Sequence, residues 1–139
     1  MKRTFLDACV LLRVFLGTQK EADAALKLMD DDTREFVSSD MLKMELLPYR
    51  LFSRKTTELE VFNEYFDKCV VHVDVDQTRF RSAFAIASQY GLQGMDAMHV
   101  DAARHAGASE LVTYEKITRQ IHTAQSDATK VVSFRSEYS

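Results

Sequence analysis

The chain contains only one proline, two cysteines and four glycines, and it has no tryptophan among its 139 residues. Two cysteines, Cys9 and Cys69, are too few for a disulfide framework or a thiolate metal cage, so we expect a reducing compartment, the cytoplasm. No apolar run reaches the roughly 18 residues that a membrane span requires, so no membrane partner is predicted. The net charge of −3 excludes proteins that hold nucleic acid by bulk positive charge alone. Nucleic acid held through a metal ion or a local basic patch stays compatible with the sequence.

Linkers, repeats and low-complexity tracts are lacking as well. No stretch rich in proline, glycine or serine divides the chain, and 46% hydrophobic with 28% charged residues is an ordinary globular composition. The length suits one domain, and we predict a single unit over residues 1–139.

Short apolar runs alternate with segments of helical periodicity. We predict strands at 4–6, 36–37, 70–73, 111–113 and 131–134, and helices at 10–16, 20–29, 40–52, 56–68, 76–90, 95–105 and 116–122. The predicted helix caps are Ser39 or Asp40, Thr56 or Thr57, and Asp76. This alternation predicts an α/β fold, a three-layer α/β/α sandwich around a parallel sheet, in which ligands bind beyond the carboxyl ends of the strands.

One acid occupies an unusual place in the predicted helix over 40–52. On a helical wheel, Lys43 and Arg50 fall together on one side, while Glu45 falls in the apolar arc between Tyr49 and Phe52. Burying an unpaired carboxylate costs roughly several kcal/mol. A glutamate at this position therefore indicates either a function or a buried ion pair with an arginine from elsewhere in the chain.

Three further acids are expected at the same edge of the sheet. Asp7 follows the first strand and Glu115 the fourth, while Asp96 lies in a helical first turn, where an acid also suits the helix dipole. His99, one turn later, is predicted to be a core residue or to support a neighbouring ligand. Gathered carboxylates repel one another and require cations, and hard oxygen ligands suit Mg²⁺ or Mn²⁺. Such a site can activate water for attack on a phosphodiester, as in metal-dependent nucleases.

Four segments carry these acids: FLDACVL over 5–11, SSDMLKMEL over 38–46, GMDAMHV over 94–100 and LVTYEK over 111–116. In order and spacing they resemble the motifs of the PIN domain family, particularly the small VapC toxins of toxin–antitoxin pairs, along the whole chain. The resemblance implies a five-stranded parallel sheet of order 3-2-1-4-5. It also implies an Mg²⁺- or Mn²⁺-dependent endoribonuclease that cleaves RNA, often as a homodimer, with an antitoxin as partner where the protein is a toxin.

The resemblance also assigns roles to individual residues. Asp7, Glu45 and Asp96 would hold one or two ions with Glu115 assisting, and either Glu45 or Asp96 would accept the proton of the attacking water. Thr113 would be a polar accessory beside the site. Three cations are candidates for binding substrate phosphates, with ordinary solvated charge as the alternative: Arg13, Lys116 and Arg119.

Two positions depart from the family pattern. Cys9 stands where the family usually has asparagine or serine, and we expect a structural thiol there rather than a nucleophile. Glu115 stands where the family usually has aspartate, and its extra methylene can still reach an ion, directly or through water.

Two other functions and one other metal site are compatible with parts of the sequence. The first alternative function is a PIN-like binding module without catalysis. The second is a receiver-like signalling domain, although Asp7 lacks an acidic partner and no lysine follows the fifth strand. His72, Asp74 and Asp76 alternate along a strand and resemble metal ligands, but Asp76 is more simply a helix cap.

Overall fold

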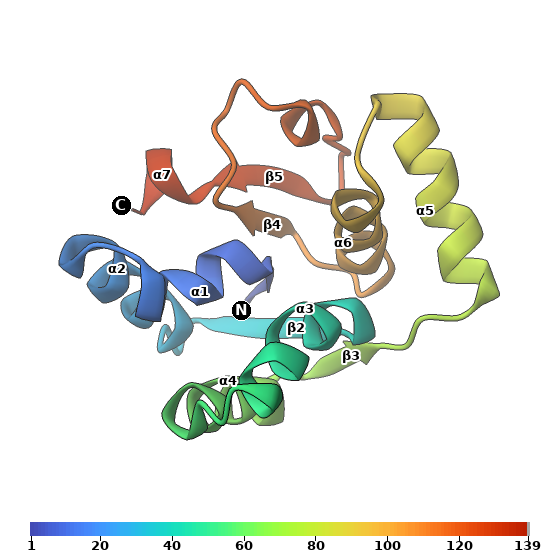
Figure 1. Ribbon diagram of the computed structural model, residues 1–139. Helices are drawn as coiled ribbons and strands as arrows, with labels where there is room; N and C mark the ends of the chain where they lie inside the picture. The colour runs from blue at the N-terminus through green and yellow to red at the C-terminus, as the bar shows by residue number, and fades with distance from the viewer. Residues whose placement is uncertain (139) are drawn as a thin grey trace.

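The computed structural model describes residues 1–138 and contains one sheet of five parallel strands (Figure 1). The strand order is β3-β2-β1-β4-β5, which confirms the predicted sheet. The strands are β1 (Lys2–Leu6), β2 (Arg34–Ser39), β3 (Val71–Val73), β4 (Glu110–Thr113) and β5 (Lys130–Ser133).

Helices connect the strands and cover both faces of the sheet, as the apolar strands predict. In Figure 1, α2 lies to the left of the strands, and α5 and α6 lie to their right. The helices are α1 (Ala8–Leu16), α2 (Gln19–Met29), α3 (Asp40–Phe52), α4 (Thr56–Lys68), α5 (Gln77–Tyr90), α6 (Gly94–His105) and α7 (Phe134–Glu137), with a 3₁₀ helix η1 (Gln120–Thr123). None of the helices within residues 1–138 is long and apolar enough to cross a membrane.

The core follows the two central strands. Phe5 and Leu6 on β1, and Leu111 and Val112 on β4, are fully buried because helices pack on both sides of them. Each such side chain contributes roughly 1.5–3 kcal/mol of burial free energy, so these strands are the firmest support in the molecule.

The register of β1 against β4 sets the position of the candidate site. Leu6 lies opposite Val112, and the backbone N–H of Asp7 donates to the Val112 carbonyl at 3.0 Å. The next residues, Asp7 and Thr113, are therefore neighbours at the carboxyl edge, although they are far apart in the chain.

Several helices begin directly after strands, and polar side chains cap them. Asp7 accepts from the N–H of Val10, and Ser39 accepts from that of Leu42, both at 3.1 Å. Asp76 caps α5 as predicted. The prediction of a threonine cap for α4 is wrong, because Lys55 precedes that helix and makes no side-chain cap.

The chain after β4 differs from the prediction in two places. The predicted helix over 116–122 is a turn followed by η1, because the N–H groups of Arg119 and His122 bond to carbonyls three residues back rather than four. The last predicted strand ends one residue early, and the buried Phe134 instead begins α7.

Candidate active site

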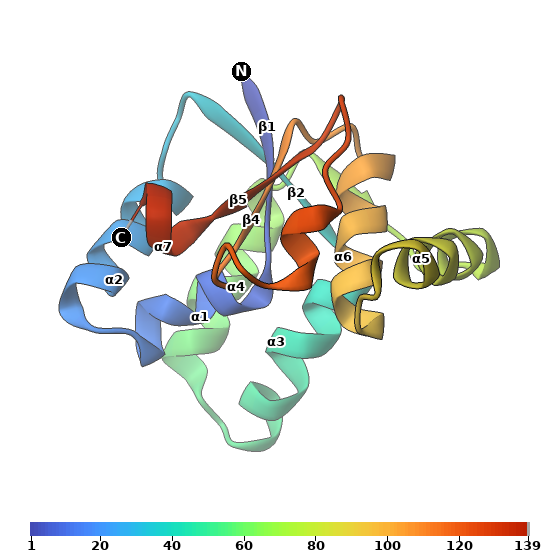
Figure 2. The same cartoon turned by 90° about the horizontal axis from the view of Figure 1, so that it is seen from above.

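Three helix N-terminal regions meet where the central strands end. Figure 2 shows α1, α3 and the start of α6 around this edge, seen from above. Asp7 lies between β1 and α1, Glu45 in the second turn of α3, and Asp96 in the first turn of α6. Glu115 follows β4 by two residues. All four predicted acids therefore lie at the carboxyl edge of one sheet.

Asp7 is buried at the centre of this edge. Its carboxylate caps α1 and also accepts a hydrogen bond from the Thr113 side chain. Burial raises the pKa of Asp7, and the negative charge of Glu45 raises it further, while the hydrogen bonds and His99 act in the opposite direction. The protein thus keeps a carboxylate in a place that opposes its ionisation.

Asp96 is in a similar position on the facing helix. Partial burial raises the pKa of Asp96, and the negative charges of Glu115 and Glu45 add to the effect. His99 and Arg119 partly offset it. The four carboxyl groups therefore form one electrostatic neighbourhood in which each additional negative charge is unfavourable.

Glu45 is held by a histidine rather than by an arginine. Its Oε1 contacts Nε2 of His99, which is buried and lies with its ring centroid 5.4 Å from that of Phe5. A carboxylate can only accept, so Nε2 of His99 donates to Glu45, while Nδ1 has no hydrogen-bond partner within the described residues. His99 is thus a buried support for a site carboxylate, one of the two roles that we predict for it.

The wheel-based placement of Glu45 is wrong in detail. Its side chain is 31% exposed, and Tyr49 and Phe52 also point to solvent. Arg50, predicted to face outward, is buried and donates to Glu58 at 3.2 Å and to the Leu46 carbonyl. Docking of α4 supplies Glu58 and reverses the orientation that the apolar residues of α3 alone would favour.

The four acids share one edge of the sheet, but their carboxylate oxygens do not converge tightly enough to surround a single ion. Within residues 1–138, the three ligand atoms that lie within 4.8 Å of one another belong to Asp40, His72 and Asp74, and no three of the four acids meet that spacing. Arg119 Nε lies 3.4 Å from Glu115, and it is the only lysine or arginine in this range with an ion pair to one of the four acids. Within residues 1–138, Asp7, Glu45 and Asp96 therefore form no ion pair with an arginine or lysine.

A family model of the PIN domain matches residues 4–124. The chain belongs to the PIN domain family. PIN domains are nucleases that use divalent metal ions. Because the chain is a PIN domain, the receiver-like alternative has no remaining support. A comparison with curated protein sequences found no match.

Solved structures share the PIN fold at low sequence identity. The VapBC2 complex of Rickettsia felis bound to a promoter DNA fragment has a TM-score of 0.62 at 12% identity and covers 94% of this chain and 98% of its own. DNA-bound VapBC from Salmonella typhimurium gives 0.58 at 16%, covering 96% and 99%. A toxin–antitoxin complex from Klebsiella pneumoniae gives 0.57 at 18%, covering 83% and 90%. These likenesses support the fold.

The donor set of this PIN domain fits a hard divalent cation. The four acids offer carboxylate oxygens, which Mg²⁺ and Mn²⁺ prefer. Cys9 is exposed as a residue, but local burial of its thiol and then the charges of Asp7 and Glu45 raise its pKa to about 12. The thiol therefore stays protonated. Since the thiolate is the form that binds metals and attacks substrates, Cys9 is suited to neither role.

The three predicted phosphate-binding cations have different surroundings. Arg119 lines a cavity of about 340 Å³ together with Asp96 and Glu115. Arg13 donates to the Cys9 carbonyl, and its guanidinium lies 4.3 Å from the ring centroid of Tyr114. Lys116 is exposed. Arg119 is thus the cation best placed to meet a ligand beside the acids.

Proposed function

We propose that this PIN domain is an Mg²⁺- or Mn²⁺-dependent endoribonuclease that hydrolyses phosphodiester bonds of RNA. The observation that carries the proposal is the set of carboxylates from separate elements, Asp7, Glu45 and Asp96, which face one edge and form no ion pair with any lysine or arginine in the described residues. Their mutual repulsion is a cost that a bound cation would relieve.

Asp7, Glu45 and Asp96 would hold one or two ions, and Glu115 would assist. When bound, such an ion lowers the pKa of a water molecule and stabilises phosphate oxygens. The hydrogen bond from Thr113 orients the Asp7 carboxylate. The contact with His99 holds the Glu45 carboxylate at the edge of the sheet, where it would bind the ion.

The remaining steps use side chains beside these ligands. Arg119, at the cavity wall, would neutralise a substrate phosphate after leaving Glu115. Either Glu45 or Asp96 would accept the proton of the attacking water. Arg13 and Lys116 are secondary candidates for contacts with the RNA backbone.

We also propose that the protein acts as the toxin of a toxin–antitoxin pair. Support comes from the three structural relatives, which are VapBC or toxin–antitoxin complexes that cover 83–96% of the chain. An antitoxin would then be its protein partner, and the cytoplasm its compartment. A single domain over residues 1–139, predicted from the length and the lack of linkers, and a homodimer, implied by the family resemblance, are further parts of the proposal.

A PIN-like binding module without catalysis is the second candidate. Two observations favour it: Glu115 replaces the usual aspartate, and within residues 1–138 no three of the four acids have ligand atoms that all lie within 4.8 Å of one another. This candidate predicts that the protein binds RNA or a partner but leaves RNA intact.

An RNase assay on the purified protein tests both candidates. We expect cleavage of single-stranded RNA with Mn²⁺ and none with EDTA. Asp7→Asn and Asp96→Asn should each lower the rate by about 10²–10³-fold, the typical loss for a group that stabilises transition-state charge. Asp67→Asn, the same change at an exposed position of α4, is the matched control and should cleave normally.

The outcomes separate the two candidates. Equal cleavage with EDTA, or in the Asp7 and Asp96 variants, would mean a contaminating RNase and remove the support for this mechanism. Binding of Mn²⁺ and RNA without cleavage would favour the binding module.

A further inference from the structure

A second group of ligands lies at the outer carboxyl edge of the sheet, away from the four acids. We infer that Asp40, His72 and Asp74 bind a divalent transition-metal ion of the Zn²⁺ class. Asp40 is the first residue of α3, directly after β2, while His72 lies in β3 and Asp74 just beyond it. The sequence alone pointed to Asp76 as the third member, but Asp76 caps α5 and Asp40 takes its place.

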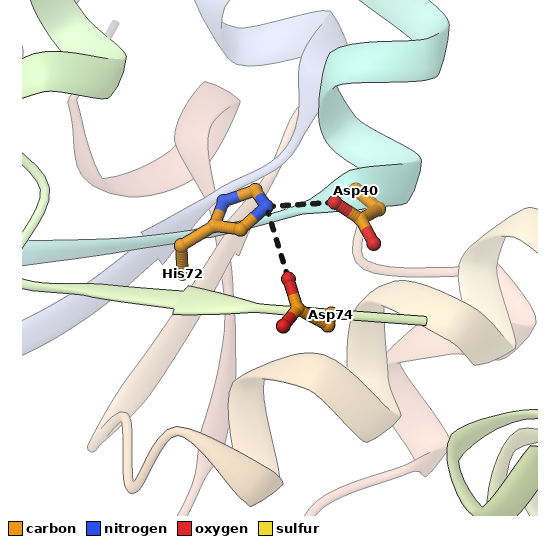
Figure 3. Close-up of side chains that lie close together, drawn as sticks. All are labelled: Asp40, His72 and Asp74. Atoms are coloured by element: carbon orange, nitrogen blue, oxygen red, sulfur yellow. Dashed lines mark hydrogen bonds and ion pairs between the residues drawn. The ribbon is translucent and has the colours of Figure 1, made fainter. Parts of the chain in front are cut away.

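The spacing of the three groups suits one ion. Nε2 of His72 lies 2.8 Å from Oδ1 of Asp40 and 3.9 Å from Oδ1 of Asp74. Figure 3 shows both carboxylates directed at this ring nitrogen from different sides. Ligands about 2.0–2.2 Å from a zinc ion are about 3–3.5 Å apart, so small side-chain rotations would complete the site. The Asp74 side chain is 85% exposed and free to make such a rotation.

Contacts outside the trio already orient two of the ligands. Ser38 is buried, and its hydroxyl lies 2.9 Å from Nδ1 of His72, which turns Nε2 toward the carboxylates. The other oxygen of Asp40 accepts from the N–H of Val75 at 2.8 Å, which leaves Oδ1 for the ion. Metal-binding histidines are commonly held in this way by a hydrogen bond at the second ring nitrogen.

The donor types select the ion. One imidazole nitrogen with two carboxylates suits Zn²⁺, Co²⁺ or Ni²⁺, whereas Mg²⁺ prefers an all-oxygen octahedron. The group is also separate from the four acids. At 100° per residue, Asp40 and Glu45 lie about 140° apart around α3 and face different sides of the helix. An ion here would join β3 to the first turn of the helix that carries Glu45.

Zinc titration by calorimetry, on the full chain carrying both Asp7→Asn and Asp96→Asn, tests this site without relying on the proposed nuclease. We expect one equivalent of Zn²⁺ to bind. His72→Gln or Asp74→Asn should weaken binding by about 100-fold, since each removes a ligand, and Ser38→Ala by about tenfold, since it removes only the support. His105→Gln, at an exposed histidine of α6, is the matched control and should bind as the parent does.

Two results would overturn the assignment. One is zinc binding of equal strength in the parent, His72→Gln and Asp74→Asn, which would put the ion elsewhere. The other is no zinc binding by the parent. Asp74→Asn keeps the test sharp if His72→Gln does not fold, because its exposed side chain carries no described contact except that with His72. Failure here would leave the RNase result unaffected, and RNase failure would leave the zinc result unaffected.

Discussion

Buried carboxylates have opposite surroundings at the amino and carboxyl ends of the sheet. At the amino end, Glu110 is buried, but Arg34 forms an ion pair with it, Thr4 donates to it at 3.0 Å, and Lys2 lies 3.5 Å away. At the carboxyl end, Asp7 is equally buried, and in residues 1–138 no arginine or lysine pairs with it.

This difference separates structure from function. A buried carboxylate with fixed cationic partners needs no further ligand, and removing one of those partners is strongly destabilising. A buried carboxylate among others has a raised pKa and gains from a ligand. Burial alone does not identify a site, whereas burial without neutralisation does.

Breaking the amino-end pair should have the largest effect. Arg34→Met leaves Glu110 buried without its main partner, and we expect a loss of about 3–5 kcal/mol in the free energy of unfolding, measured with urea. Arg81→Met, at an exposed position of α5, should change it by less than about 0.5 kcal/mol. Equal effects of the two changes would show that the amino-end pair is not a structural element.

Filling the carboxyl end should stabilise the protein. At a free Mn²⁺ concentration of 100 times its dissociation constant, we expect about 2.7 kcal/mol of added stability. The variant with both Asp7→Asn and Asp96→Asn should gain much less under the same conditions. Urea unfolding with Mn²⁺ or EDTA measures both values, and an equal gain in the variant would place the stabilising ion outside the acids.

Changing pH should have the smallest effect at the same end. The pKa of Asp7 is higher in the folded protein than in the unfolded chain, where it is about 3.9. The contribution of Asp7 to stability is therefore fully present below the unfolded-state pKa and is lost as the pH rises through the folded-state pKa. In EDTA, Asp7→Asn keeps the helix cap and should become more stable than the original protein as pH rises, by about 1 kcal/mol. A difference that is constant with pH would contradict the raised pKa.

The strands and two of the helix caps could be predicted because they depend on nearby residues. Continuous apolar runs identified the buried strands, and a short polar side chain just before a segment of helical periodicity identified the caps at Ser39 and Asp76. The same local signals placed Asp7, Asp96 and Glu115 at one edge once the strand order followed from the family resemblance.

The remaining features depend on partners from other elements. The inward turn of Arg50 requires Glu58 on α4, and the support of Glu45 by His99 joins residues 54 positions apart. The turn over 116–119 has helical periodicity, but its hydrogen bonds span three residues rather than four. A helical wheel or a hydrophobic period describes a single segment. It therefore contains no information about contacts with residues of other helices and strands.

The pairing of β1 with β4 has a consequence for synthesis on the ribosome. Asp7 emerges early, but Thr113, its neighbour in the finished sheet, is residue 113 of 139. The proposed nuclease site therefore cannot assemble on a nascent chain until translation has passed β4, so the proposed activity would be withheld while β4 is still unsynthesised.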